Sequence, residues 1–251
     1  MRLTVVLPTL DEAGNLPALT ERIWKQLEGA PIVVSDDGST DGTRELVRAM
    51  EAAGKPIRLI ARTGRPCLTD SIQDGIDAAT TPYVAWMDAD LSHPPELLPS
   101  LLAAAERSGC AIATRYAQGG KAKSTSGDTP DSFFAVVLSS ILNFLVRRQL
   151  GNHVTDYTSG FIVVRRDLLL PHRLVGDYGE YFIELVHYLI RAGVPIVELP
   201  YESPPRVWGE SKTGTTLPKL LRRGLKYLWL MLRLQLRRSG SSRPALPPPT
   251  T

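Results

Sequence analysis

The sequence predicts an α/β protein built on a mainly parallel sheet. Short aliphatic runs alternate with helical patterns as far as residue 114, which is typical of repeated strand and helix units. Polar loops follow the first, second and fourth of these runs, and ligands of open α/β sheets bind at the carboxyl ends of strands. The chain has 251 residues, 43% of them hydrophobic, so it can enclose a sizeable core. We therefore expect a globular domain with a ligand site at one edge of its sheet.

Each expected element rests on a local pattern in the chain. Runs rich in β-branched and aliphatic residues predict strands at 3–7, 31–35, 57–61, 83–87, 110–114, 161–166 and 195–200. Apolar residues at helical spacing predict helices over 15–28, 43–53, 68–79, 95–108 and 180–193. The apolar stretch 133–146 contains Ser and Asn and is too short to cross a bilayer, so it predicts a buried helix. Residues 117–131, rich in Gly, Ser, Thr and Lys, predict a loop that could close over a site.

Charge is distributed unevenly along the chain. The formal net charge is only +3, yet nine of the 29 basic residues follow Glu210, and no acidic residue does. The 20 basic residues before that point face 26 acidic ones, which gives a body near −6 and a tail near +9. Such asymmetry implies an anionic partner for the tail.

Residues 215–238 predict a basic amphipathic helix. One helical face carries Leu217, Leu220, Leu221, Leu225, Leu228, Leu232 and Leu236, and basic residues occupy the rest of the surface. Tyr227 and Trp229 suit a membrane interface, and the leucine face favours an anionic lipid surface over nucleic acid, so we expect no nucleic-acid partner. The alternative is a helix packed on the domain with a solvated basic face.

The remaining boundaries follow from composition. Residues 1–214 are expected to form the folded domain, and residues 239–251, rich in Ser and Pro, predict a disordered tail. The amino-terminal residues turn polar after a short apolar run, unlike a secretory signal. We therefore expect a cytoplasmic protein that associates peripherally with the membrane.

Two carboxylates one residue apart follow the fourth expected strand. Asp88 and Asp90 lie on the loop that ends this run, where both can reach one hard cation through oxygen. Mg²⁺ or Mn²⁺ would suit them, and because such ions usually bind substrate phosphates as well, the pair points to a diphosphate ligand. The alternative is that Asp90 or Ser92 caps the helix that begins near Pro94 and Pro95.

The loop after the second expected strand is also acidic. Asp36 and Asp37 end an apolar run, and Gly38 then allows a sharp turn into the next helix. An acidic residue at such a strand end can accept hydrogen bonds from a nucleobase or a ribose. A simple turn is the alternative, because Asp-Gly pairs are common in turns.

Six blocks, in this order, resemble the family 2 glycosyltransferases of GT-A fold, and within them the dolichol-phosphate or polyprenol-phosphate mannosyltransferases. They are VLPTLDEAGNLP, IVVSDDGSTDGT, MDADLSHPPELLP, ATRYAQGG, DYTSGFIVVRR and RVWGESKTG, and they span most of residues 3–214. The resemblance implies a GT-A fold: a mainly parallel nucleotide-binding sheet flanked by helices, here with the basic helix added.

The resemblance also implies roles for single residues. Pro8, Glu12 and Asp37, with Asp36 beside them, would line the nucleotide site, and Asp88 and Asp90 would hold the metal on the donor diphosphate. Arg115 would face the donor or acceptor phosphate, Arg206 and Lys212 would clamp phosphates, and Asp90 could orient the nucleophile. The catalytic group is thus expected to comprise Asp90, Arg115, Arg206 and Lys212.

The chain departs from the family pattern at several places. Leu10 and Asp11 replace the usual Tyr and Asn, and Ser92 stands where some members have Gln. The usual glycine-rich loop with a lysine is replaced by residues 62–71, and residues 126–132 lack the basic residues common there.

We expect a metal-dependent inverting transfer of a hexose, mannose first, from a nucleotide-diphosphate sugar to a polyprenyl phosphate. GDP-mannose is the first choice of donor and a UDP-sugar the second. The acceptor could instead be a metabolite, a glycan or a protein. An alternative of another class is a nucleotide-sugar sensor or a membrane scaffold without catalytic activity.

Overall fold

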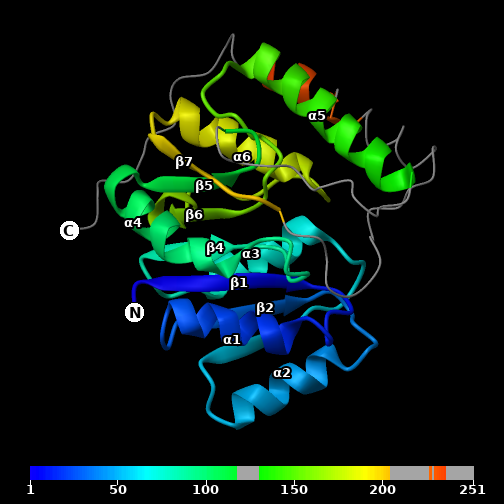
Figure 1. Ribbon diagram of the computed structural model, residues 1–251, viewed down its shortest axis with the longest axis vertical. Coiled ribbons are helices and arrows are strands. Elements are labelled where there is room, and N and C mark those ends of the chain that lie inside the picture. Colours follow the sequence, from blue (N-terminus) through cyan, green and yellow to red (C-terminus); the bar gives the residue numbers. More distant parts are fainter. Residues whose placement is uncertain (118–129, 204–225, 228, 236–251) are drawn as a thin grey trace.

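One seven-stranded sheet forms the centre of the molecule (Figure 1). The computed structural model describes residues 1–117, 130–203, 226–227 and 229–235, and only the backbone within 130–139. The strands lie in the order β3-β2-β1-β4-β6-β5-β7. Their bounds are β1 Leu3–Thr9, β2 Ile32–Asp36, β3 Ile57–Ala61, β4 Tyr83–Trp86, β5 Cys110–Thr114, β6 Ile162–Arg165 and β7 Ile196–Pro200. All seven predicted strands are therefore present.

The sheet is parallel except at β6. This strand pairs antiparallel with β4 on one side and with β5 on the other, whereas the remaining neighbours pair in parallel. The predicted mainly parallel sheet is confirmed, but the reversal of β6 carries no local sequence signal. Because of that reversal, the start of β6 lies at the same edge of the sheet as the ends of β4 and β5.

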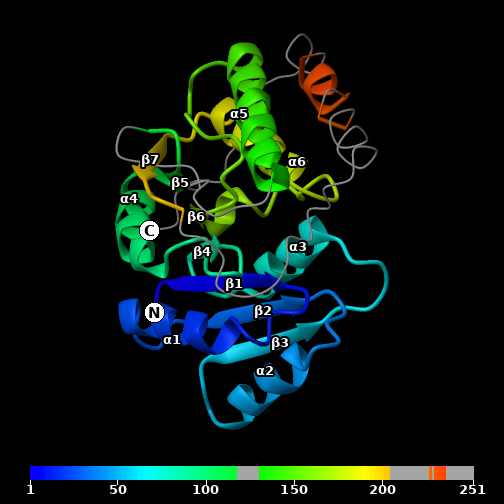
Figure 2. The ribbon, with the colours of Figure 1, turned by 45° about the vertical axis from the view of Figure 1, so that its right-hand side comes forward.

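Helices cover both faces of the sheet (Figures 1 and 2). The α-helices are α1 Leu16–Gln26, α2 Thr43–Ala52, α3 Leu68–Ala78, α4 Leu98–Ser108, α5 Pro130–Leu150 and α6 Glu180–Arg191, and short 3₁₀ turns occupy η1 Pro95–Leu97 and η2 Arg166–Leu168. Apolar residues of α1, α2 and α4 join one buried cluster, and those of α3, α5 and α6 join another. The two clusters lie on opposite sides of the sheet because alternate side chains of a strand point to opposite faces.

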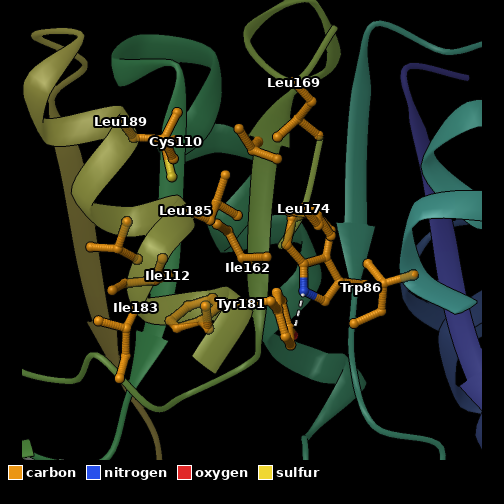
Figure 3. Packing of buried hydrophobic residues seen from close by; sticks show 14 of the residues in the cluster. Trp86, Cys110, Ile112, Ile162, Leu169, Leu174, Tyr181, Ile183, Leu185 and Leu189 are labelled. Atoms are coloured by element: carbon orange, nitrogen blue, oxygen red, sulfur yellow. Dashed lines mark hydrogen bonds between the residues drawn. The ribbon is translucent and has the colours of Figure 1, made fainter. Parts of the chain in front are cut away.

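The buried cluster beneath α3, α5 and α6 contains aromatic side chains from β4 and α6. Trp86 is buried on β4, and its Nε1 donates a hydrogen bond of 3.1 Å to the hydroxyl of Tyr181. Figure 3 shows this bond between Trp86 and Tyr181 among aliphatic side chains such as Ile162 and Leu185. The bond satisfies the polar tips of both rings inside an apolar core.

The described part of the basic helix packs on this cluster. Leu230, Met231 and Leu234 are buried there, and Gln149 Nε2 of α5 donates a hydrogen bond of 2.6 Å to the Met231 carbonyl. By contrast, Trp229 is 62% exposed and Leu232 is 56% exposed. One face of residues 229–235 is therefore packed on the domain, as the alternative to a membrane-binding helix expected. Leu232, which belongs to the predicted leucine face, is exposed. The proposed division at 215–238 and 239–251 stays a prediction, because most of those residues lie outside the described part of the chain.

The helix α5 is only partly buried. Val146 and Leu150 belong to the core, but Ile141, Phe144 and Leu145 are exposed along one side of the helix. The prediction of a wholly buried helix is therefore wrong for this side. Among the described residues, we find no helix both long enough and apolar enough to cross a membrane.

A glycine allows α3 to approach β1 closely. A Cβ atom built on Gly75 would lie 2.2 Å from Cγ1 of Val6, which is too close for any real contact. Helix propensity alone would make Gly75→Ala stabilising by about 1 kcal/mol. We expect the clash to reverse the sign and to lower the free energy of unfolding by ~1–3 kcal/mol, as measured by urea denaturation.

The matched control for this prediction is the Val6→Ala background. Removing both γ-methyl groups takes away the two nearest atoms and leaves Cβ of residue 6 at 3.2 Å, so Gly75→Ala should cost much less when introduced there. An equal loss in the two backgrounds would show that the contact is not the cause.

Candidate active site

The three acidic or polar loops meet at one edge of the sheet. Thr9 at the end of β1 pairs with Asp36 at the end of β2, and Val6 of β1 pairs with Trp86, two residues before Asp88. The ends of β2, β1 and β4 are therefore neighbours, as the parallel sheet predicted. The end of β5 and the start of β6 lie at the same edge because β6 runs antiparallel to both of its neighbours.

Asp36 is fully buried and holds its own loop together. Its carboxylate accepts hydrogen bonds from the Thr9 hydroxyl at 3.0 Å and the Ser39 amide at 3.0 Å, and from the Arg44 guanidinium. Burial raises the pKa of this carboxyl, but the bonds from Ser39, Arg44 and Thr9 outweigh it, and the net shift is downward. The expectation that Asp36 lies beside the nucleotide stays a prediction; within the described residues its carboxylate binds Thr9, Ser39 and Arg44.

Asp37 is bound by an arginine from the end of the neighbouring strand. One carboxylate oxygen pairs with Nη1 of Arg62, and the other accepts the Cys67 amide at 3.1 Å. Arg62 also donates to Asp74 at 2.7 Å. Burial raises the pKa of Asp37, and Arg62 only partly counteracts this. Both of these partners of the Asp37 carboxylate come from residues 62–71, the segment that departs from the family pattern.

The loop after β1 is joined to the loop after β2. Asp11, with a left-handed φ of 53°, accepts the Thr40 amide at 2.8 Å and donates its own amide to the Ser39 hydroxyl at 2.7 Å. The carboxylate of Asp11 thus supplies an acceptor such as an Asn carbonyl would supply. The Glu12 amide donates to the Thr43 hydroxyl at 2.9 Å, and Asn15 donates to the Glu12 carboxylate at 2.7 Å. Half-buried Pro8 lies on β1 just before this joined pair of loops.

Asp88 and Asp90 differ in exposure. Asp88 is exposed at the end of β4, whereas Asp90 is buried and one of its oxygens accepts the Ser92 amide at 3.0 Å. Regular helix begins only at Leu98, after the 3₁₀ turn Pro95–Leu97, and neither start has a side-chain cap. The alternative that Asp90 or Ser92 caps this helix is therefore wrong.

The donor set of this loop fits a hard divalent cation. Carboxylate oxygens are the ligands that Mg²⁺ and Mn²⁺ prefer, and Asp88 presents one at the surface. Within the described part of the chain, no group of three or more His, Cys, Asp or Glu side chains is arranged to hold a metal. A cation bound by Asp88 and Asp90 would take further oxygen ligands, for which water and substrate phosphates are the usual source.

Arg115, directly after β5, is paired with a buried carboxylate. Its Nε and Nη2 donate to Asp156 at 2.9 and 3.1 Å, and Nη2 also donates to the Thr158 hydroxyl at 2.9 Å. Burial lowers the pKa of Arg115, but Asp156 outweighs this and raises it, so the guanidinium stays charged. Asp156 is completely buried and is held by Glu198 of β7, which accepts its amide at 3.3 Å.

Two of the expected site residues cannot be placed. Arg206 and Lys212 lie outside the described residues. Sequence reasoning missed Arg62 and Asp156 as partners of Asp37 and Arg115. The position of Asp156 at the head of the block DYTSGF was the available signal.

The chain belongs to glycosyl transferase family 2. The model of that family matches residues 4–170, a stretch that runs from β1 into the segment after η2 and includes the acidic loops and Arg115. The sequence resemblance to this family is thereby confirmed.

Several curated relatives are mannosyltransferases by name. A dolichol-phosphate mannosyltransferase of Pyrococcus furiosus is 34% identical over 230 residues, 88% of this chain and 62% of that protein. An undecaprenyl-phosphate mannosyltransferase of Micrococcus luteus is 29% identical, over 94% of this chain and 99% of that one. A polyprenol monophosphomannose synthase of Mycolicibacterium smegmatis is 32% identical, over 84% and 80%. The chain therefore spans less than two thirds of the Pyrococcus relative and nearly all of the Micrococcus one.

Solved structures with the same fold include glucosyl-3-phosphoglycerate synthase from Mycobacterium tuberculosis. Its complex with Mn²⁺ and UDP-glucose has a TM-score of 0.63 and 20% identity, covering 91% of this chain and 78% of that one. Its complex with Mn²⁺, UDP and phosphoglyceric acid gives the same TM-score and identity, covering 93% and 78%. The predicted GT-A fold is confirmed, and divalent metal is present in structures of this fold.

The buried Asp36 ion pair should make stability depend on pH. Because the folded-state pKa of Asp36 lies below the ordinary value of about 3.9, the pair stabilises fully above that value, and its contribution is lost as pH falls through the folded pKa. Breaking a buried pair by removing one partner's charge typically costs about 3 kcal/mol, so we expect Asp36→Asn to lose about that much at pH 7. The loss should shrink below pH ~4.

Glu45→Gln provides the control, because Glu45 is an exposed acidic residue beside Arg48 at 3.7 Å. It should change the free energy of unfolding by no more than about 0.5 kcal/mol at any pH. Urea denaturation of the three proteins between pH 3 and 7 measures both effects. A loss in Asp36→Asn that stays constant with pH would contradict the assignment.

Proposed function

We propose that this protein transfers mannose from a nucleotide-diphosphate sugar to a polyprenyl phosphate, with GDP-mannose as the first choice of donor. The observation that carries the proposal is the convergence at one sheet edge of Asp37, of the Asp88 and Asp90 loop, and of Arg115. The names of the relatives supply the sugar and the acceptor class.

In this proposal, the donor binds across the ends of β2, β1 and β4. Asp37, held by Arg62, accepts hydrogen bonds from the nucleoside, and Pro8 and Glu12 border the same loop. Asp88 and Asp90 would hold Mg²⁺ or Mn²⁺, and the cation would supply positive charge to neutralise the departing diphosphate. Arg206 and Lys212 are proposed to add charge-assisted bonds to the phosphates.

The acceptor requires little help with proton transfer. A phosphate monoester loses its second proton near pH ~6, so the attacking oxygen is already anionic at neutral pH. It attacks the anomeric carbon from the face opposite the diphosphate, the bond from that carbon to the diphosphate oxygen breaks, and the configuration inverts. No general base is needed, and Asp90 is proposed to orient the nucleophile.

Arg115 is proposed to face the phosphate of the acceptor. Its described hydrogen bonds to Asp156 and Thr158 use Nε and Nη2, which leaves Nη1 as the nitrogen for a substrate oxygen. The pairing fixes the plane of the guanidinium before substrate binds. A group held in advance loses less entropy on binding, which suits recognition of a phosphate.

The membrane surface is proposed to be reached through the basic helix. Trp229 and Leu232 are exposed together, and the Arg233 guanidinium lies over the Trp229 ring at 5.4 Å. Ile141, Phe144 and Leu145 are exposed on α5, which the basic helix contacts through Gln149. Aromatic, aliphatic and basic side chains of this kind suit an anionic lipid interface. This would place the enzyme peripherally on the cytoplasmic face, beside a lipid acceptor.

Radiolabelled transfer tests the reaction. Purified protein with GDP-[¹⁴C]mannose, Mn²⁺ or Mg²⁺ and undecaprenyl phosphate should yield label in the lipid extract. Asp90→Asn should reduce the rate at least 100-fold, because it removes one of two carboxylates that hold the cation. Asp70→Asn serves as the control and should retain most activity. Asp70 lies near Arg62, and its side chain is more exposed than that of Asp90.

Two results would contradict this assignment. Label that enters only an aqueous product would favour a metabolite, glycan or protein acceptor. Binding of the nucleotide sugar without turnover, in wild type and Asp90→Asn alike, would favour a sensor or scaffold.

Membrane association has a separate test. We expect Trp229→Ser with Leu232→Gln to reduce cosedimentation with vesicles of phosphatidylglycerol and phosphatidylcholine by about 10-fold or more, because two exposed apolar contacts are lost. Leu170→Gln is the matched control, since Leu170 is 64% exposed and lies just after η2. Equal cosedimentation of all three proteins would exclude this surface as the anchor.

A further inference from the structure

A buried histidine contacts the backbone of the acidic loop after β4. His93 is only 4% exposed, and its Nδ1 accepts a hydrogen bond of 3.0 Å from the backbone amide of Asp88. An amide N–H can only donate, so Nδ1 must carry the lone pair and the ring proton lies on Nε2. The bond ties the backbone of the first acidic residue of the loop to a side chain five residues later.

Two aromatic rings fix the orientation of the imidazole. The Phe161 ring stacks on it with centroids 5.0 Å apart and an angle of 15° between planes. The Tyr201 ring meets it edge-on, with centroids 5.9 Å apart. Phe161 lies just before β6 and Tyr201 just after β7, so His93 links the loop to two further strand ends. Such contacts restrict both the position and the rotation of the ring.

The loop needs an external support of this kind. Leu91 has a left-handed φ of 64°, an uncommon conformation for a branched residue, and the loop has no regular structure before Pro95. The Ser92 amide holds Asp90 from within the loop at 3.0 Å. At the other carboxylate, the bond to His93 holds the backbone of Asp88, although the side chain of Asp88 is exposed.

We propose that His93 is a positioning residue for the divalent-cation site, acting through the Asp88 backbone without touching the cation. The inference rests on the proposed function, because it takes Asp88 and Asp90 as the metal ligands. Partners that orient metal ligands typically contribute about 10- to 100-fold to metal affinity. His93 would contribute by holding Asp88 at the distance from Asp90 that one cation requires.

A purely structural role is the competing explanation, and two substitutions separate the roles. His93→Phe keeps a flat ring for Phe161 but has no acceptor for the Asp88 amide. His93→Asn loses most of the ring, yet its side-chain oxygen can occupy the place of Nδ1. Should His93→Phe fold poorly, His93→Gln gives the same test, because its amide lies beyond the position of Nδ1.

The experiment is a titration of the full chain with Mn²⁺ in the presence of GDP, followed by the electron paramagnetic resonance signal of free Mn²⁺. We expect His93→Phe to weaken Mn²⁺ binding at least 10-fold, and His93→Asn to stay within about 3-fold of wild type. Thermal unfolding should show the reverse order, with His93→Asn the less stable variant because it loses ring stacking.

Three outcomes would overturn the proposal. Unchanged Mn²⁺ affinity in His93→Phe would leave His93 with a packing role only. Equal weakening in His93→Phe and His93→Asn would show that the acceptor is not what matters. Absence of Mn²⁺ binding by the wild-type protein with GDP would instead remove the proposed metal site itself, so the two failures are distinguishable.

Discussion

The pairing of β1 with β2 on one side and β4 on the other is the constraint on which the site depends. Parallel pairing in these registers makes three strands end together, so the loops that follow them cannot avoid one another. Each loop alone is an ordinary polar turn. Their joint position brings Asp37 and Asp88 to the same edge with β1 between them, and these are the residues proposed above for the nucleoside and for the cation.

Three buried or partly buried aspartates at this edge form ion pairs with arginines from other elements. Asp36 is bound by Arg44 of α2, Asp37 by Arg62 at the end of β3, and Asp156 by Arg115 at the end of β5. At Asp36 and Asp37, burial raises the pKa of the carboxyl group, and the paired arginine lowers it. Asp88 differs, because its side chain is exposed where a substrate phosphate would arrive. The site therefore combines carboxylates that are committed to the fold with one that is presented outward.

The sequence predicted the elements well and the contacts between them poorly. Strands and helices follow from local periodicity, so all seven strands and the helices of the first half were found. The antiparallel direction of β6 was not, because strand direction depends on how the intervening chain returns to the sheet. Similarly, nothing near Asp36 in the sequence reveals that Arg44 and Thr9 bind its carboxylate, and its predicted place beside the nucleotide stays a prediction. Arg62 binds a carboxylate 25 residues earlier, which only the fold brings within reach. His93 is a near neighbour of Asp88 in the chain, but their contact depends on the conformation of the loop between them. The outward side of α5 could not be inferred from an apolar run.

The reversal of β6 has a consequence for how such an enzyme can change over evolution. The segment with Asp156 and Phe161 reaches this edge just before β6 begins, whereas the loops proposed to bind the donor follow the ends of β1, β2 and β4. The two sides are thus encoded in separate stretches of the chain. Under the proposed function, insertions or substitutions between β5 and β6 would reshape the acceptor side without altering the length of any loop proposed to bind the donor. A lineage of such enzymes would then acquire new acceptors while its sugar donor stays the same.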